Sequence, residues 1–149
     1  MQNFSDAEIT LIKQELKAAV DTLIRGCETL DMDLAFRVFL DAPDFRMIGM
    51  DGTLCDYRTY VDNNINYLSA CSGFKLTTLN EEIKILDSDT AVFAWEYQAE
   101  AVLKTGDRDL IEKAGATFVF SKIGGEWKVV HYHESTLPPV RISGINGLS

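Results

Sequence analysis

Residues 115–135 read GATFVFSKIGGEWKVVHYHES, and this stretch decides the fold class. The segments 114–122 and 127–135 are rich in β-branched and aromatic residues, as strands are, and the glycines between them mark a turn. Two more strands are predicted upstream, over residues 75–86 and 91–105. The longer one would reach about 50 Å if extended, so it must bend within a small domain. The second half of the chain therefore predicts a curved sheet of consecutive antiparallel strands.

A long helix is predicted near the start of the chain. Ser5 and Glu8 have the spacing of a capping box, in which each side chain accepts a hydrogen bond from the other residue's backbone N–H. Beyond them, apolar residues recur at steps of three and four, which puts one stripe on a helix running to about Thr29. The stripe consists of Ile9, Ile12, Leu16, Ala19 and Leu23. A helix with such a stripe needs an apolar surface to cover.

Two further helices and a short strand are predicted before the long strands begin. Asp31 can cap a second helix that continues to Leu40. Residues 45–50 fit a short strand, and a third helix follows, with Gly73 as its C-terminal stop. Three helices followed by a run of strands indicate an α+β fold, with the helices packed on one face of a curved sheet. Such an arrangement encloses a cone, which is a natural pocket for a small molecule.

Length, composition and charge narrow the class of protein. The 149 residues fit a single domain, residues 1–149, in which Pro138 and Pro139 favour an extended tail over residues 140–149. With 46% hydrophobic and 25% charged residues, the chain has the balance of a folded protein. Its net charge of -9 argues against nucleic acid and membranes as partners, because both interactions rest on a positive field.

The cysteines and the first residues predict a compartment. Cys27, Cys55 and Cys71 are odd in number and follow no metal-ligand spacing, which favours reduced thiols. Residues 1–10 lack the basic and apolar regions of a signal peptide, and no apolar run approaches the ~18 residues of a membrane span. We therefore expect a cytoplasmic protein.

The two histidines of the chain, His131 and His133, lie beside Glu134 in the last predicted strand. Side chains alternate across a strand, so the histidines share one face and Glu134 lies on the other with Tyr132. On a regular strand these three residues cannot ligate one metal ion, so neither a metal site nor a cofactor is expected.

The turn at Gly124-Gly125 decides which neighbours each face meets. A two-residue loop would place Phe118 beside the histidine face. An odd-length loop, with Gly125 in the left-handed conformation, would instead place Phe118 with Tyr132 and Glu134. The residues alone leave both registers open.

Residues 115–139, the segment DSDTAVFAWEY (87–97) and the order of the first helices together resemble the nuclear transport factor 2-like superfamily. Within it the chain is most similar to SnoaL-like domains and to the association domain of calcium/calmodulin-dependent protein kinase type II. The strongest local signal is Thr117 on a strand, a glycine turn, Trp127, and a histidine-aromatic-histidine motif that ends at Ser135. The resemblance implies a cone-shaped, cystatin-like roll with a pocket inside, usually a homodimer through the outer sheet face. It implies no single function, because the superfamily includes isomerases, cyclases, dehydratases, transport adaptors and oligomerisation domains.

Two functional patterns of these relatives are absent. The kinase association domain lines its pocket with arginines that suit a carboxylate ligand, whereas the matching positions here are Tyr97, Phe118 and Glu134. A pocket histidine of that domain falls at about Tyr57, and the catalytic aspartate of ketosteroid isomerases falls at Gly49. The resemblance therefore favours neither a carboxylate site nor an isomerase.

The resemblance favours the odd-length loop, because it places Phe118 and Glu134 together in the pocket. The side chains that then point into the cone are Phe93, Trp95, Tyr97, Phe118, Phe120, Val130, Tyr132 and Glu134. His131 and His133 then face outward, towards a dimer partner. The candidate ligand-binding residues are Tyr57, Tyr60, Phe93, Trp95, Tyr97, Phe118, Tyr132 and Glu134. The aromatic members fit an ordinary core equally well.

Glu134 has two interpretations. It can be a rim residue paired with Arg46, Arg58 or Lys128, or a carboxylate in an aromatic cavity whose desolvation raises its pKa. In the second case it could serve as a general acid/base or as the counter-ion of a cationic ligand.

Three functions follow from these observations. The first is binding of a neutral or cationic, partly apolar small molecule. The second is a SnoaL-like enzyme that uses Glu134 as acid/base and Tyr57 or Tyr97 as a hydrogen-bond donor. The third is an interaction module that acts through the outer sheet face. Separately, residues 106–112 could be a lid over the cone mouth, with Arg108 meeting an anionic group, or a solvated connection between two strands.

Overall fold

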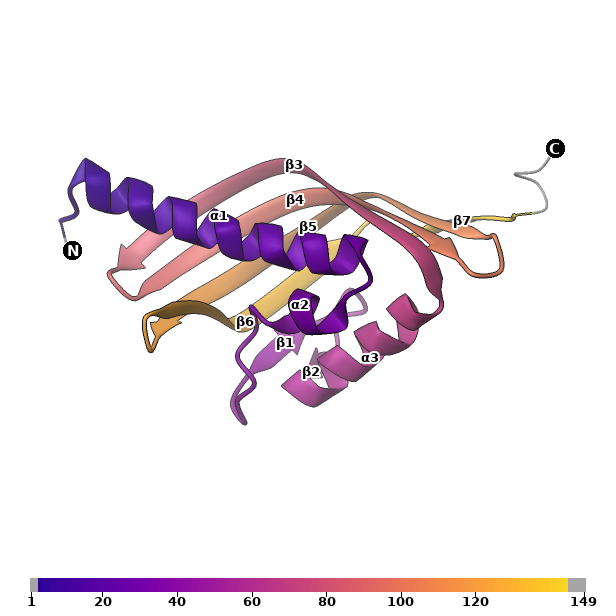
Figure 1. Ribbon diagram of the computed structural model, residues 1–149, viewed down its shortest axis with the longest axis horizontal. Coiled ribbons are helices and arrows are strands. Elements are labelled where there is room, and N and C mark those ends of the chain that lie inside the picture. Colours follow the sequence, from indigo (N-terminus) through magenta and orange to yellow (C-terminus); the bar gives the residue numbers. More distant parts are fainter. Residues whose placement is uncertain (1–2, 145–149) are drawn as a thin grey trace.

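The structure, a computed structural model that describes residues 3–144, has three helices on one face of a strongly curved sheet (Figure 1). In chain order the elements are α1 (Asp6–Glu28), α2 (Met32–Phe36), β1 (Arg46–Ile48), β2 (Leu54–Cys55), α3 (Tyr57–Ser69), β3 (Cys71–Asp87), β4 (Thr90–Leu103), β5 (Arg108–Ile123), β6 (Glu126–Thr136) and β7 (Val140–Ile142). The strands follow the order β2-β1-β6-β5-β4-β3, and β7 pairs with β5. Neighbouring strands are antiparallel except β1 and β6. The α+β prediction is confirmed.

Helix α1 begins and ends close to where the sequence predicts. The Ser5 hydroxyl accepts a hydrogen bond from the Glu8 backbone N–H at 3.1 Å, and the Glu8 carboxylate accepts one from the Ser5 backbone N–H at 3.3 Å. The apolar stripe, with Leu16 fully buried, covers the sheet, as Figure 1 shows by the course of α1 across the strands. Among residues 3–144, no helix is both long and apolar enough to cross a membrane.

Gly26 lets α1 and α2 approach each other closely. A Cβ atom at this position would lie 2.2 Å from the backbone nitrogen of Ala35, a contact that no real side chain makes. A glycine is therefore required where the two helices meet.

The second helix is shorter than predicted. Asp31 caps it, because its side chain accepts a hydrogen bond from the Leu34 backbone N–H at 3.1 Å, but the helix ends at Phe36. The backbone of residues 38–40 then pairs with Val129 of β6 through two hydrogen bonds of 2.8 and 2.9 Å. The apolar residues of this segment are thus buried by strand-like pairing, so the prediction of a helix to Leu40 is wrong.

The third helix and the segment before it also differ in detail. Strand β2 is not predicted, since two residues carry no periodicity. Asp56 caps α3 by accepting a hydrogen bond from the Thr59 backbone N–H at 2.9 Å. The helix ends at Ser69, and Gly73, the predicted stop, lies within β3 opposite Val102.

Residues 106–112 form no lid. Strand β5 begins at Arg108, whose guanidinium pairs with the Glu100 carboxylate on β4. Residues 108–110 pair with β4 on one side and with β7 on the other. Part of the predicted tail is thus a strand, and residues 145–149 lie outside the described part of the chain.

The β5–β6 hairpin combines a two-residue turn with a bulge. Gly124 and Gly125 have φ values of 60° and 83°, which fit a type I′ turn, so the odd-length loop is wrong. However, Val130 is an extra residue in the ladder, and it shifts the pairing so that Phe118 still lies opposite Tyr132. Val130 is therefore not directed into the cone, contrary to the prediction, and Val129 is buried in its place.

Candidate functional site

A cavity of about 490 Å³ lies between the helices and the inner face of the sheet. It forms where β4 continues past Tyr97 with Ala99 and Ala101, because these small side chains leave space that the aromatic residues fill elsewhere. Of the eight predicted ligand-binding residues, five line this cavity: Tyr60, Trp95, Tyr97, Tyr132 and Glu134.

The other three predicted residues lie outside the cavity. Phe93 and Phe118 are fully buried and pack edge to face with ring centroids 5.9 Å apart, so they belong to the closed part of the core. The ring of Tyr57 packs edge-on against Phe45 at 5.7 Å and does not line the cavity. The structure therefore does not bring these three residues to the wall of this cavity.

Glu134 reaches the cavity from β6, and its half-buried side chain is desolvated there. Burial raises the pKa of its carboxyl group, and a hydrogen bond from the Tyr132 hydroxyl acts in the opposite direction. Because a carboxylate only accepts, Tyr132 is the donor to Glu134. The Tyr132 hydroxyl also lowers the pKa of Tyr97, against the larger effect of burial, which raises it.

None of the predicted ion-pair partners reaches Glu134 in residues 3–144. Arg46 and Lys128 donate to backbone carbonyl oxygens, and Arg58 pairs with a carboxylate on its own helix. The interpretation of Glu134 as an ion-paired rim residue therefore fails. The buried phenols around the carboxylate respond to its charge, since burial and that charge raise the pKa of Tyr60.

The indole of Trp95 and the ring of Tyr97 are stacked on one wall of the cavity. Their centroids are 4.0 Å apart and their planes differ by 18°. The Trp95 indole N–H donates to the Thr78 hydroxyl at 2.9 Å, which fixes the orientation of the indole. The wall is therefore a rigid aromatic surface.

The sequence did not identify the residues at the mouth of the cavity. The Asp109 carboxylate accepts a hydrogen bond from the Tyr67 hydroxyl at 2.7 Å and two from the Arg141 guanidinium at 2.6 and 2.8 Å. Arg141 lowers the pKa of Asp109, and Pro139 lines the cavity next to them. The sequence signal that could have revealed them is in residues 108–112. There Asp109 and Ile111 are two residues apart, as side chains on one face of a strand are, and both line the cavity.

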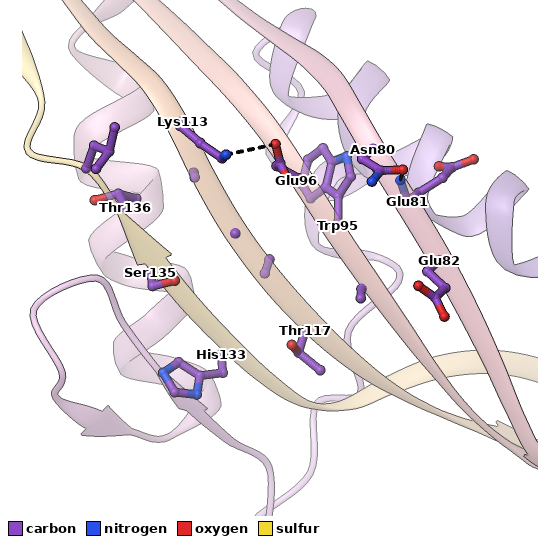
Figure 2. Close-up of a pocket in the computed structure, with 15 residues that line it drawn as sticks. Asn80, Glu81, Glu82, Trp95, Glu96, Lys113, Thr117, His133, Ser135 and Thr136 are labelled. Carbon is purple, nitrogen blue, oxygen red and sulfur yellow. Dashed lines mark hydrogen bonds and ion pairs between the residues drawn. The ribbon is translucent and has the colours of Figure 1, made fainter.

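The opposite face of the same sheet carries a shallow groove of about 700 Å³. Figure 2 shows Thr117, His133 and Ser135 along this groove, and the dashed line joins the Lys113 ammonium to the Glu96 carboxylate at 3.3 Å. The prediction that His133 and Glu134 point to opposite faces is confirmed. Within residues 3–144 no three histidine, cysteine or acidic side chains are grouped to hold a metal ion.

Residues 12–138 match the calcium/calmodulin dependent protein kinase II association domain family. The chain belongs to this family. A solved structure from Xanthomonas campestris assigned to the same domain is 25% identical, with 83% of this chain and 86% of that chain covered and a TM-score of 0.69. No curated protein matches the chain.

Two further solved structures share the fold. A nuclear transport factor 2-like superfamily protein from Salmonella enterica is 19% identical, with 87% and 94% of the two chains covered and a TM-score of 0.76. A hexachlorocyclohexane dehydrochlorinase LinA-type3 from Novosphingobium barchaimii is 14% identical, with 94% and 96% covered and a TM-score of 0.75. At these identities the likeness shows the fold alone, which is the nuclear transport factor 2-like cone.

Proposed function

We propose that this protein binds a neutral or cationic, partly apolar small molecule in its inner cavity. The observation that supports this most directly is the cavity itself, whose volume of about 490 Å³ falls in the ~300–1,000 Å³ range of small-molecule sites. Apolar side chains such as Leu23, Phe36 and Leu68 line it together with a few polar groups. Such a lining suits a ligand with an apolar body and one polar group.

A substitution that fills the cavity tests this function. Ala99→Phe should abolish binding of compounds found in a fragment screen by NMR, because the added ring occupies the cavity. Gln98→Phe is the matched control, since Gln98 is the exposed neighbour whose side chain points to the other face. A screen without hits, or hits that still bind the Ala99→Phe protein, would contradict the proposal.

A second candidate function is a SnoaL-like cyclase, isomerase or hydro-lyase. The observation that favours it is the raised pKa of Glu134 next to Tyr132, because a carboxyl group with a raised pKa is a usable general acid/base. One relative in fold is a dehydrochlorinase by name. In this case Glu134→Gln should lose turnover of a substrate and retain its affinity, whereas a pure binding protein has no turnover to lose.

We also propose a homodimer that forms through the outer sheet face, as the association domain family suggests. The groove between β3 and β6 offers small side chains such as Ala94 and Thr117 to a second copy. Thr117→Arg should reduce the mass measured by light scattering from twice 16.7 kDa to 16.7 kDa, and Gln14→Arg on the exposed side of α1 should leave it unchanged. A wild-type protein of 16.7 kDa would refute the dimer.

A further inference from the structure

The wall of the inner cavity carries negative charge only. The residues of 3–144 that line it include the carboxylates of Asp51, Asp109 and Glu134 and no lysine, arginine or histidine. Two of these carboxylates have partners in the protein: Asp109 accepts from Arg141, and Asp51 accepts from the Thr53 backbone N–H at 2.9 Å. Among residues 3–144, the one side chain that donates to Glu134 is the neutral phenol of Tyr132.

The surroundings of Glu134 are those of a cation site. The faces of aromatic rings attract cations electrostatically, and this attraction is stronger where water is excluded. Tyr60 and Tyr132 lie with ring centroids 5.8 Å apart, and the stacked pair of Trp95 and Tyr97 forms the adjoining wall. A carboxylate among four aromatic rings therefore offers both a counter-ion and ring faces to one positive group.

We propose that the ligand of this cavity is a protonated amine with an apolar body of about one or two rings, whose ammonium group pairs with Glu134. The inference rests on the binding function proposed above and names the class of ligand for that site. The ammonium donates to the Glu134 carboxylate, while the apolar body lies against Leu23, Phe36 and Leu68.

Other charge types fit this cavity less well. An anionic ligand would meet three carboxylates without a basic side chain to pair with, which is unfavourable in a partly desolvated site. A neutral ligand would leave Glu134 with the Tyr132 phenol as its sole partner, so the desolvation of the carboxylate would not be offset. A protonated amine satisfies the carboxylate in full.

Binding of an amine should release a proton over the pH range in which Glu134 is protonated in the free protein. The ammonium favours the carboxylate form, so it lowers the pKa that burial has raised, and affinity should increase with pH through that range. The other titratable groups that face Glu134 are Cys27 on α1, Cys55 on β2, Tyr60 on α3, Tyr97 on β4 and Tyr132 on β6. Burial raises the pKa of all five, so they keep their protons in this range and the release is assigned to Glu134.

Three probes of matched shape test the class of ligand: phenethylamine, phenethyl alcohol and hydrocinnamate, which are cationic, neutral and anionic near pH 7. We expect isothermal titration to give at least about tenfold tighter binding of the amine than of the alcohol, and no binding of the anion. Titrations of the amine in buffers of different ionisation enthalpy, stepped upward from about pH 4.5, should show proton release that fades as pH rises through the folded-state pKa of Glu134.

Two variants decide where the preference arises. Glu134→Gln should remove the preference for phenethylamine over phenethyl alcohol and the proton release. Glu96→Gln removes the same charge from the outer face of β4 and should leave both unchanged. Thermal unfolding of both variants shows that each is folded.

The failures of the two proposals are distinguishable. If the alcohol or the anion binds as tightly as the amine, or if the hits of the fragment screen are mainly neutral or anionic, the amine class is wrong and small-molecule binding stands. If neither the probes nor the screen give binding that Ala99→Phe abolishes, both proposals are wrong.

Discussion

The two faces of strands β4–β6 differ in chemistry although they alternate residue by residue along the same chain. On the inner face Phe118 is fully buried among other rings, whereas its neighbour Thr117 on the outer face is exposed. The carboxylates differ as well. On the outer face Glu96 pairs with Lys113, whereas Glu134 on the inner face has no cationic partner in residues 3–144. The same sheet thus has a desolvated carboxylate on its inner face and a hydrated, ion-paired surface on its outer face.

This difference depends on an intact alternation, and the alternation depends on the bulge at Val130. If Val130 were paired with Val119 in a regular ladder, the type I′ turn would place Trp127 and Val129 on the inner face together with the histidines, and Tyr132 and Glu134 on the outer face. The bulge therefore keeps Tyr132 and Glu134 on the inner face and the histidines on the outer face.

Phe118→Ala tests the packed part of the inner face. The ring is fully buried and lies 4.7 Å from the Tyr132 ring between centroids, so its removal leaves a cavity and should lower the free energy of unfolding by about 3–5 kcal/mol. Thr117→Ala is the control on the outer face and should cost less than about 1 kcal/mol. Urea denaturation measures both. Equal losses for the two variants would abolish the distinction between the faces.

Glu134→Gln should stabilise the protein at neutral pH, on the order of 1 kcal/mol, because it removes a desolvated charge. The folded-state pKa of Glu134 is raised above its ordinary 4.5, so its stabilising contribution is present below that value and is lost as pH rises through the folded-state pKa. The stability difference between variant and wild type should therefore grow as pH rises above about 4.5 and then level off. Glu96→Gln should give no such gain in the same series of urea denaturations, and a destabilised Glu134→Gln protein at pH 7 would refute the desolvated state.

Arg141→Leu should have the smallest effect and compares the two carboxylates of the inner face. The Arg141 pair with Asp109 is exposed, so its loss should change local protection more than global stability. We expect amide hydrogens of β7 to exchange roughly two- to fivefold faster, with β4 unchanged. Arg58→Leu, which removes an exposed pair on α3, should leave β7 exchange unaffected. Unchanged exchange in β7 would show that the pair does not hold this strand.

The sequence predicts the fold well where the signal is local. The capping box at Ser5, the stripe of α1 and the long strands each follow from spacing within a few residues. Elements that depend on partners far along the chain were missed. Strand-like pairing of residues 38–40 with Val129 and the continuation of β5 to Arg108 are decided by what lies beside them in space.

The sequence predicted which face of the sheet carries the site, but not which residues of that face line the cavity. Alternation identifies Trp95, Tyr97 and Glu134 as inward, but it does not tell which inward residues meet a cavity and which meet each other. That depends on volume along the strand: Phe93 packs against aromatic neighbours, whereas Ala99 lies beside open space. The predicted pairing of Phe118 with Tyr132 is correct, but its cause is different. A two-residue turn followed by a one-residue bulge places the same side chains on the inner face as an odd-length loop would.

Gly26 limits how this cavity can be redesigned or diverge. Any side chain there would push α2 away from α1, and with it Phe36, which forms part of the cavity wall opposite the sheet. The distance between that wall and the sheet is therefore a fixed dimension of the scaffold. New ligand preferences must come from exchanging the side chains that line the space, such as Ala99 or Glu134, and not from moving the helices apart.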